Sequence, residues 1–155
     1  MAYYDTLAPG YDELHGEEQE AKMRLISPFV KGRVLDVGCG TGISGKFFKD
    51  IVGIDPSGEM IRKAPFPAVQ GVAEKLPYAD KSFDAVICVT ALHNTEYPEV
   101  AVREMARVSK GRVVITLLRK SPKFDKLQQL VERSFRVERR IDDPHDLLLI
   151  CKDKQ

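Results

Sequence analysis

Three glycines at alternate positions carry the strongest chemical signal in this sequence. Gly38, Gly40 and Gly42 follow a short apolar run, and an acid, Asp36, lies just before them. Glycine tolerates a positive φ and lets a ligand approach the main chain. A helix that starts after such a turn also offers unpaired N–H groups. The pattern therefore predicts a buried strand, a ligand-binding turn and a following helix.

Three classes of ligand use such a turn, and the spacing separates them. A dinucleotide site needs a third glycine at position 43, where this chain has Ile43. A P-loop fits residues 40–46 closely, but Phe47 replaces the Ser or Thr whose hydroxyl ligates Mg²⁺. The pattern that remains is Asp-x-Gly-x-Gly-x-Gly.

The segment 34–42 resembles motif I of the class I S-adenosylmethionine (SAM)-dependent methyltransferases. The resemblance implies that SAM is the cofactor and that S-adenosylhomocysteine is the product. It assigns these motif I residues to the cofactor site: Asp36, Gly38, Cys39, Gly40 and Gly42.

The segment 53–57 resembles the next conserved segment of that family, most closely in the group of ubiquinone and menaquinone biosynthesis methyltransferases. The resemblance makes Asp55 the acceptor of hydrogen bonds from both ribose hydroxyls and places Pro56 beside the cofactor. A carboxylate at a strand end suits that role because its oxygens accept several hydrogen bonds. The alternative is that Asp55 caps the next helix, a position for which Ser57 competes.

Residues 73–78 resemble the segment that flanks the adenine ring. The family usually has an Asp at the position of Val72, where it accepts a bond from the adenine amino group. Here the contacts are left to Val72 and to the backbone of Ala73. Glu74 has two interpretations, a carboxylate that fixes the loop and a direct cofactor contact.

The segment 89–94 lies where the family transfers its methyl group, and the resemblance places Val89 and Thr90 beside the cofactor. It lacks the Asn/Asp-Pro-Pro-Tyr signature of enzymes that methylate adenine N6 or glutamine amides, which disfavours those substrates. His93 has two interpretations. It is either a general base for an O–H or acidic C–H nucleophile, or a residue that packs at a helix start beside Tyr97.

Strand and helix signals alternate along the chain, as in a doubly wound α/β fold. The segment 142–146 is too short for a parallel crossover, so the last two strands are expected to be antiparallel. We expect a Rossmann-like mixed seven-stranded sheet with a terminal antiparallel strand and helices on both faces. The expected strands are the apolar run that leads into Gly38, and the segments 50–55, 67–70, 83–89, 112–118, 136–141 and 147–151. The expected helices are 16–26, a helix after the glycine turn with Ile43, Phe47 and Phe48 on its apolar side, a short helix capped by Ser57, 98–108, and a helix opened by Ser121.

The 155 residues suit a single methyltransferase domain, with residues 1–32 as a lead-in and 33–155 as the catalytic core. The lead-in carries Tyr3, Tyr4 and Tyr11 and resembles the segment that covers the cofactor in the family. We expect a lid that turns Tyr11 inward; the alternative is a helix packed permanently on the sheet edge.

Composition favours a cytoplasmic protein without membrane association. Hydrophobic residues make up 43% of the chain and charged residues 30%. No apolar run approaches the roughly 20 residues of a membrane span, and we see no signal peptide. The three cysteines are odd in number and lie beside apolar segments, which favours buried thiols in a reducing compartment. No metal-ligand spacing is present, so we expect no metal.

Charge is unevenly distributed along the chain. Residues 1–102 carry 10 Lys and Arg against 15 Asp and Glu, whereas residues 103–155 carry 14 against 8. Solvated helix faces explain such a bias, and so does an anionic partner.

Only residues 119–121 separate the fifth strand from the next helix, which leaves the methyl-transfer face uncapped. The acceptor is unidentified: a large substrate such as RNA or protein, a site completed by a partner subunit, and a homo-oligomer all fit. The alternative function is a non-catalytic SAM-binding partner subunit.

Overall fold

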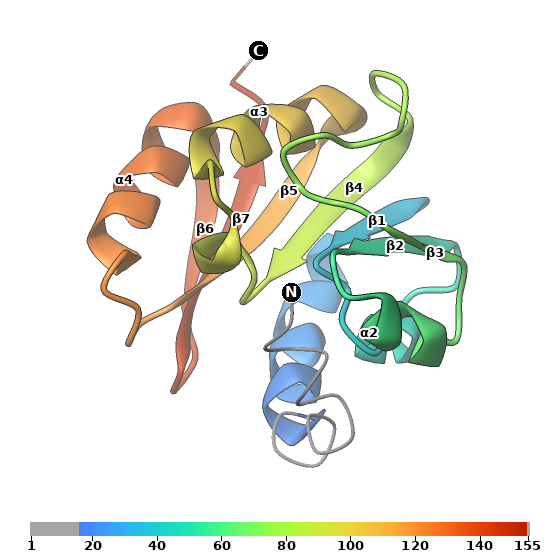
Figure 1. Cartoon of the computed structure of the whole chain (residues 1–155). Coiled ribbons are helices and arrows are strands. Elements are labelled where there is room, and N and C mark those ends of the chain that lie inside the picture. The colour runs from blue at the N-terminus through green and yellow to red at the C-terminus, as the bar shows by residue number, and fades with distance from the viewer. Residues whose placement is uncertain (1–15, 155) are drawn as a thin grey trace.

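The computed structural model describes residues 16–154. Their strands form one mixed seven-stranded sheet in the order β3-β2-β1-β4-β5-β7-β6 (Figure 1). Strands β1 to β5 run parallel, whereas β7 is antiparallel to both of its neighbours. The predicted fold class is confirmed. The strands are β1 (Val34–Val37), β2 (Ile51–Asp55), β3 (Ala68–Gln70), β4 (Phe83–Val89), β5 (Ser109–Leu118), β6 (Arg136–Asp142) and β7 (Asp146–Lys152).

The helices follow the sequence signals that mark their starts. Pro98 occupies the first turn of α3, where its missing N–H costs nothing. Ser57 Oγ accepts the Met60 N–H at 3.2 Å and so caps α2. The helices are α2 (Gly58–Lys63), α3 (Pro98–Val108), α4 (Phe124–Ser134), and the 3₁₀ turns η1 (Ser27–Phe29), η2 (Ile43–Lys46) and η3 (Leu92–Asn94); residues 16–26 form an N-terminal helix.

The helix that we expected after the glycine turn is the short 3₁₀ turn η2, so its length was wrong. Gly45 lies inside this segment, and a Cβ there would come within 2.8 Å of the Phe66 ring. The segment therefore packs its backbone against the loop after α2 and does not extend as a helix. Strand β5 also begins earlier than expected, at Ser109 and not at residue 112.

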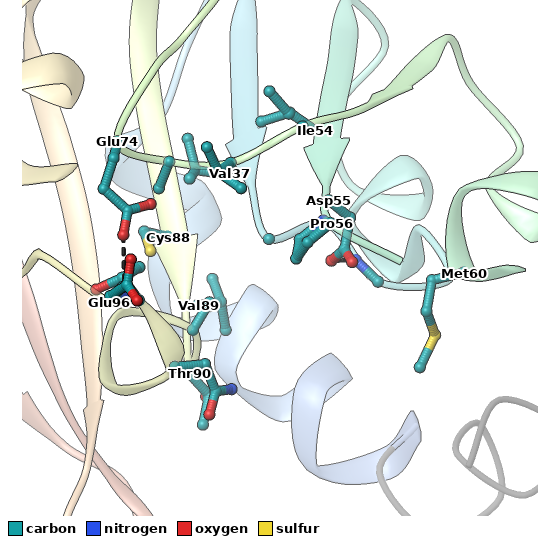
Figure 2. A pocket seen from close by; sticks show the side chains of 18 of the residues that line it. Val37, Ile54, Asp55, Pro56, Met60, Glu74, Cys88, Val89, Thr90 and Glu96 are labelled. Carbon is teal, nitrogen blue, oxygen red and sulfur yellow. Dashed lines mark hydrogen bonds between the residues drawn. The ribbon is translucent and has the colours of Figure 1, made fainter. Parts of the chain in front are cut away.

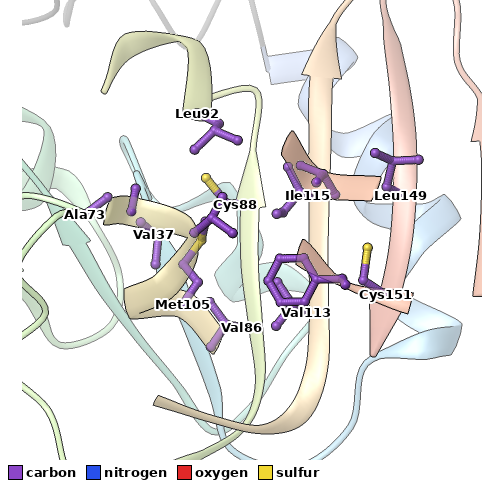
Figure 3. Close-up of a cluster of buried hydrophobic side chains, with 14 of the residues drawn as sticks. Val37, Ala73, Val86, Cys88, Leu92, Met105, Val113, Ile115, Leu149 and Cys151 are labelled. Carbon is purple, nitrogen blue, oxygen red and sulfur yellow. The ribbon is translucent and has the colours of Figure 1, made fainter. Parts of the chain in front are cut away.

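Two apolar layers bury the sheet from both faces. Along β4, Ala85, Ile87 and Val89 belong to the layer that includes Met23 and Ile26 of the N-terminal helix. The intervening β4 residues belong to the opposite layer, under α3 and α4 (Figure 3). This alternation is the period-two pattern of a strand that is buried on both sides.

The order of the strands places a crevice at the carboxyl ends of β1 and β4. The chain runs from β1 outward to β2 and β3, and then crosses back to β4 on the other side of β1. Open α/β sheets bind ligands at such a switch point. No helix in residues 16–154 is both long and apolar enough to cross a bilayer.

Candidate functional site

A cleft of about 500 Å³ opens at this switch point, within the usual size of small-molecule sites (Figure 2). Its walls come from the ends of β1, β2 and β4 and from the segments that follow β3 and β4. Most of the predicted cofactor residues line it. These are Gly38, Gly40, Asp55, Pro56, Val72, Ala73, Val89 and Thr90.

The glycine turn needs the conformations that only glycine adopts without cost. Gly38, Gly40 and Gly42 have φ values of +78°, +56° and +85°. A Cβ on Gly38 would lie 2.6 Å from the Ala91 Cβ, so the turn packs directly against the exit of β4. Gly42 lines neither of the two cavities that we describe; a Cβ there would lie 2.6 Å from Pro65 Cδ.

Asp55 is held at the end of β2 with its carboxylate at the cleft. The Gly40 N–H donates to Asp55 Oδ2 at 3.0 Å, and the Ser57 N–H donates to Oδ1 at 2.9 Å. These bonds orient the carboxylate at the cleft, and a carboxylate oxygen can accept more than one hydrogen bond. Ser57, not Asp55, supplies the cap of α2.

A smaller hollow shares Gly38, Gly40 and Val89 with the main cleft, and Asp36 and Cys39 line it. Asp36 is 2% exposed and accepts a hydrogen bond from Ser44 Oγ. The pKa of Asp36 is raised to about 7: burial is the largest cause, the Ser44 hydrogen bond opposes the shift, and the nearby Asp55 charge adds to it. Asp36 is thus a buried acid whose pKa lies well above its usual range.

The edge of the cleft at Val72 is apolar and open. Val72 is 47% exposed, whereas Ala73 beside it is buried. Glu74 Oε2 accepts the N–H groups of Glu96 and Tyr97 at 2.8 and 2.9 Å, and the first of these bonds is visible in Figure 2. Glu74 therefore fixes the loop before α3, which is the first of its two interpretations, and it also borders the cleft.

His93 lies on η3 and lines neither cavity. Its carbonyl oxygen accepts a hydrogen bond from Lys123 Nζ at 3.1 Å. Burial lowers the pKa of His93, Asp146 opposes this shift, and the positive charges of Lys123 and Lys22 add to it. The general-base role has no support in this placement and stays a prediction. Tyr11, which was also predicted as a site residue, lies outside the described residues.

Several residues of the cleft were not singled out as site residues from the sequence. Met60, Asn94, Thr95 and Tyr97 line it from α2 and from the loop before α3, which has no motif of its own. Cys88 lines it as well, and burial raises the pKa of its thiol to about 12, which makes it a poor nucleophile. Among residues 16–154 no cluster of His, Cys, Asp and Glu could hold a metal ion.

Comparison with known proteins agrees with this geometry. Residues 35–116 match the model of the methyltransferase domain family. A demethylmenaquinone methyltransferase of Renibacterium salmoninarum is 35% identical over 133 residues, covering 74% of this chain and 56% of its own length. An uncharacterized protein of Methanocaldococcus jannaschii is 38% identical over 116 residues, covering 70% and 46%. The chain thus spans about half the length of these relatives.

Solved structures share the fold over nearly the whole chain. A SAM-dependent methyltransferase from Thermotoga maritima has a TM-score of 0.79 at 18% identity and covers 99% of this chain and 100% of its own. A Haloferax volcanii methyltransferase, solved with the Trm112 methyltransferase activator, has a TM-score of 0.81 at 16% identity and covers 98% of both chains. The family match includes the glycine turn, Asp55 and the exit of β4. The chain therefore belongs to the SAM-dependent methyltransferases.

Proposed function

We propose that this protein transfers a methyl group from SAM to a nucleophilic acceptor. The observation that carries the proposal is the cleft at the switch point, where a glycine turn and a strand-end carboxylate meet. Gly38 and Gly40 bring the main chain to the ligand, and Asp55 accepts the ribose hydroxyls. Asp55 is oriented for this by two N–H groups. The fit to SAM rests on these groups and on the apolar walls of the cleft.

The residues of the chain bind and orient in this mechanism, and none needs to activate the methyl group. When bound, SAM supplies a sulfonium methyl that is already reactive, so alignment with the acceptor provides much of the rate. Val72 and Ala73 receive the adenine ring, whereas Val89 and Thr90 border the methyl group. The apolar side chains of Val37, Ile54 and Met60 exclude water from the part of the cleft between the adenine ring and the methyl group.

An open methyl-transfer face favours a large acceptor such as RNA or protein. Only residues 119–123 separate β5 from α4, which is too short a connection for an added cap. The basic residues nearby are exposed, but several already have partners: Arg119 pairs with Asp142, and Arg139 stacks on Phe29. The exposed cations of this connection are Arg119, Lys120 and Lys123. Arg140 pairs with Glu132, and Arg136 begins β6 at the end of the sheet away from the cleft, so these two add less to a surface for an anionic acceptor.

Methyl transfer into fractionated cell extract tests this function. The protein is incubated with methyl-labelled SAM, and the product is separated into RNA, protein and small molecules. We expect label in one macromolecular fraction, and we expect the Asp55→Ala variant to lose it. Label confined to small molecules would refute the large acceptor but not the activity. A folded protein that binds no SAM would refute the proposal itself.

A second candidate is a SAM-binding subunit that acts only with a partner. The Haloferax volcanii relative in fold has almost the same length as this chain and was solved in a complex with an activator. The uncapped face of the present chain fits completion of the site by another subunit. SAM binding without label transfer by the isolated protein, restored by adding an extract fraction, would favour this candidate over independent activity.

The N-terminal lid enters here as a proposal for residues 1–15 only. Residues 16–26 contribute Met23 and Ile26 to the core, so this helix is packed on the sheet. That placement favours the alternative of a permanent helix for the second half of the lead-in. We propose that the preceding residues close over the cofactor. Hydrogen exchange across residues 2–15 should then slow when S-adenosylhomocysteine is added, and equal exchange in both states would contradict a lid.

A further inference from the structure

A buried charge pair lies directly behind the wall of the cleft. Lys22 of the N-terminal helix is 2% exposed, and Asp146 at the start of β7 is fully buried. Their charged atoms, Lys22 Nζ and Asp146 Oδ1, are 3.1 Å apart. The contact is an ion pair without hydrogen-bond geometry, since Asp146 Oδ1 accepts no hydrogen bond among the described residues. Buried pairs of this kind cost so much desolvation that an apolar pair often stabilises a fold as well or better.

Both charges are tied to Thr90, the first residue after β4. Lys22 Nζ donates to Thr90 Oγ1 at 2.7 Å, and Thr90 Oγ1 donates to Asp146 Oδ2 at 2.7 Å. Thr116 of β5 completes the arrangement: it accepts the Thr90 N–H at 2.8 Å and donates to Asp146 Oδ2 at 2.9 Å. We call these four residues the Lys22–Asp146 cluster.

Thr90 has a conformation that it would not adopt without such ties. Its φ is +52°, in the left-handed region that a β-branched residue avoids. The cluster holds both its N–H and its hydroxyl. Strain of this kind persists only where the surroundings over-determine it. The charge pair is therefore better explained as fixing the backbone conformation of Thr90 than as stabilising the fold.

The position of Thr90 shapes the cleft at the glycine turn. Thr90 and Ala91 both line the cleft, and the Ala91 methyl fills the space where Gly38 has no Cβ. If Thr90 relaxed to an extended conformation, Ala91 would move and the wall against Gly38 would shift. Lys22 also donates to Gln19 Oε1 at 2.9 Å, and Gln19 lines the smaller hollow beside the same glycine.

We infer that Lys22 and Asp146 are positioning residues. They hold Thr90 and the N-terminal helix against the part of the cleft that lies farthest from the adenine ring of bound SAM. The inference rests on the proposed binding of SAM in this cleft. The N-terminal helix, which lies outside the sheet, then contributes to the site by supplying one half of the charge pair. Neither residue lines the main cleft, so both act through Thr90.

The test replaces the pair by apolar residues and measures both folding and binding. In the Lys22→Met/Asp146→Leu variant we expect unfolding by urea at the same concentration as in the wild type, or at a higher one. We expect SAM and S-adenosylhomocysteine to bind about tenfold more weakly, because the competent form of Thr90 is then only a minor population. Binding of adenosine, which lacks the sulfur, its methyl group and the amino-acid end, should stay within about threefold.

A second variant breaks the cluster without touching the charges or the cleft. Thr116→Val removes the hydroxyl that contacts the Thr90 N–H, the Thr90 hydroxyl and Asp146, and it should weaken SAM binding in the same selective way. The matched control is Ser109→Ala, which removes a buried hydroxyl at the opposite end of the same strand. Lys46→Met controls for the loss of a lysine that pairs with the same helix, through Glu20 on the surface. Both controls should bind SAM as the wild type does.

The outcomes separate this inference from the proposed function. A wild type that binds no SAM would refute the proposed function. Unchanged SAM affinity in a folded Lys22→Met/Asp146→Leu variant, or equal weakening of SAM and adenosine, would overturn the inference. Failure of that variant to fold would also overturn it, since the pair would then serve stability and not position.

Discussion

The buried carboxyl of Asp36 should make the stability of this protein depend on pH in an unusual direction. In the folded state burial raises its pKa to about 7 from an ordinary value of 3.8. Between these values the folded state binds a proton that the unfolded chain releases. The contribution to stability is therefore fully present below about pH 4, and it is lost as the pH rises through 7. Between pH 5 and pH 8 this amounts to roughly 2–3 kcal/mol.

Asp36→Asn removes this titration while its amide oxygen can still accept the Ser44 hydrogen bond. Urea unfolding at pH 5 and pH 8 measures the effect as a difference between variant and wild type, in which other groups largely cancel. We expect the variant to gain about 2–3 kcal/mol relative to the wild type on going from pH 5 to pH 8. Ser44→Ala should do the opposite and extend the loss to higher pH, because the Ser44 bond lowers the pKa of Asp36. Parallel pH profiles for wild type and Asp36→Asn would refute the reasoning.

Three further predictions concern the cofactor cleft and are measured by calorimetry with SAM. Asp55→Ala should weaken binding by about 1–3 kcal/mol, the cost of losing a charge-assisted bond, and unchanged affinity would remove Asp55 from the site. Val72→Asp should tighten binding by about 1 kcal/mol if its carboxylate reaches the adenine amino group; weaker binding would mean that the base is held otherwise. Gly38→Ala should abolish binding, because its Cβ would lie 2.6 Å from the Ala91 Cβ. Adding Ala91→Gly should restore part of the affinity, and no restoration would argue against this clash as the cause.

Most of the fold could be predicted because its elements carry local signals. Strand β4 and helix α3 match their expected bounds. The strand is apolar except for Asp84, and the helix opens with proline and has helical apolar spacing. The short link before β7 correctly implied an antiparallel pair. The longer helix predicted after the glycine turn was wrong. The apolar spacing from Ile43 suits a helix, but the Gly45 backbone packs closely on Phe66 and the segment is a single 3₁₀ turn.

The candidate site was predictable where glycines and a strand-end acid mark it, and not where it depends on distant contacts. Nothing in the sequence distinguishes Lys22 from the solvated lysines of other helices, because its partner Asp146 is far along the chain. The left-handed Thr90 gives no signal either, since this conformation is imposed by tertiary contacts and opposes its local preference. The strand pattern suggests that Asp36 is buried, but the size of its pKa shift depends on how complete the burial is and on the contacts with Ser44 and Asp55.

Titration calorimetry of the unmodified protein with four ligands tests the central claim most directly. The ligands are SAM, S-adenosylhomocysteine, ATP and NAD, each added at the same concentration and pH. The glycine spacing, with Ile43 and Phe47 at the deciding positions, and the cleft at Asp55 predict one site that binds SAM and S-adenosylhomocysteine and neither of the others. Binding of ATP or NAD without binding of SAM would contradict it.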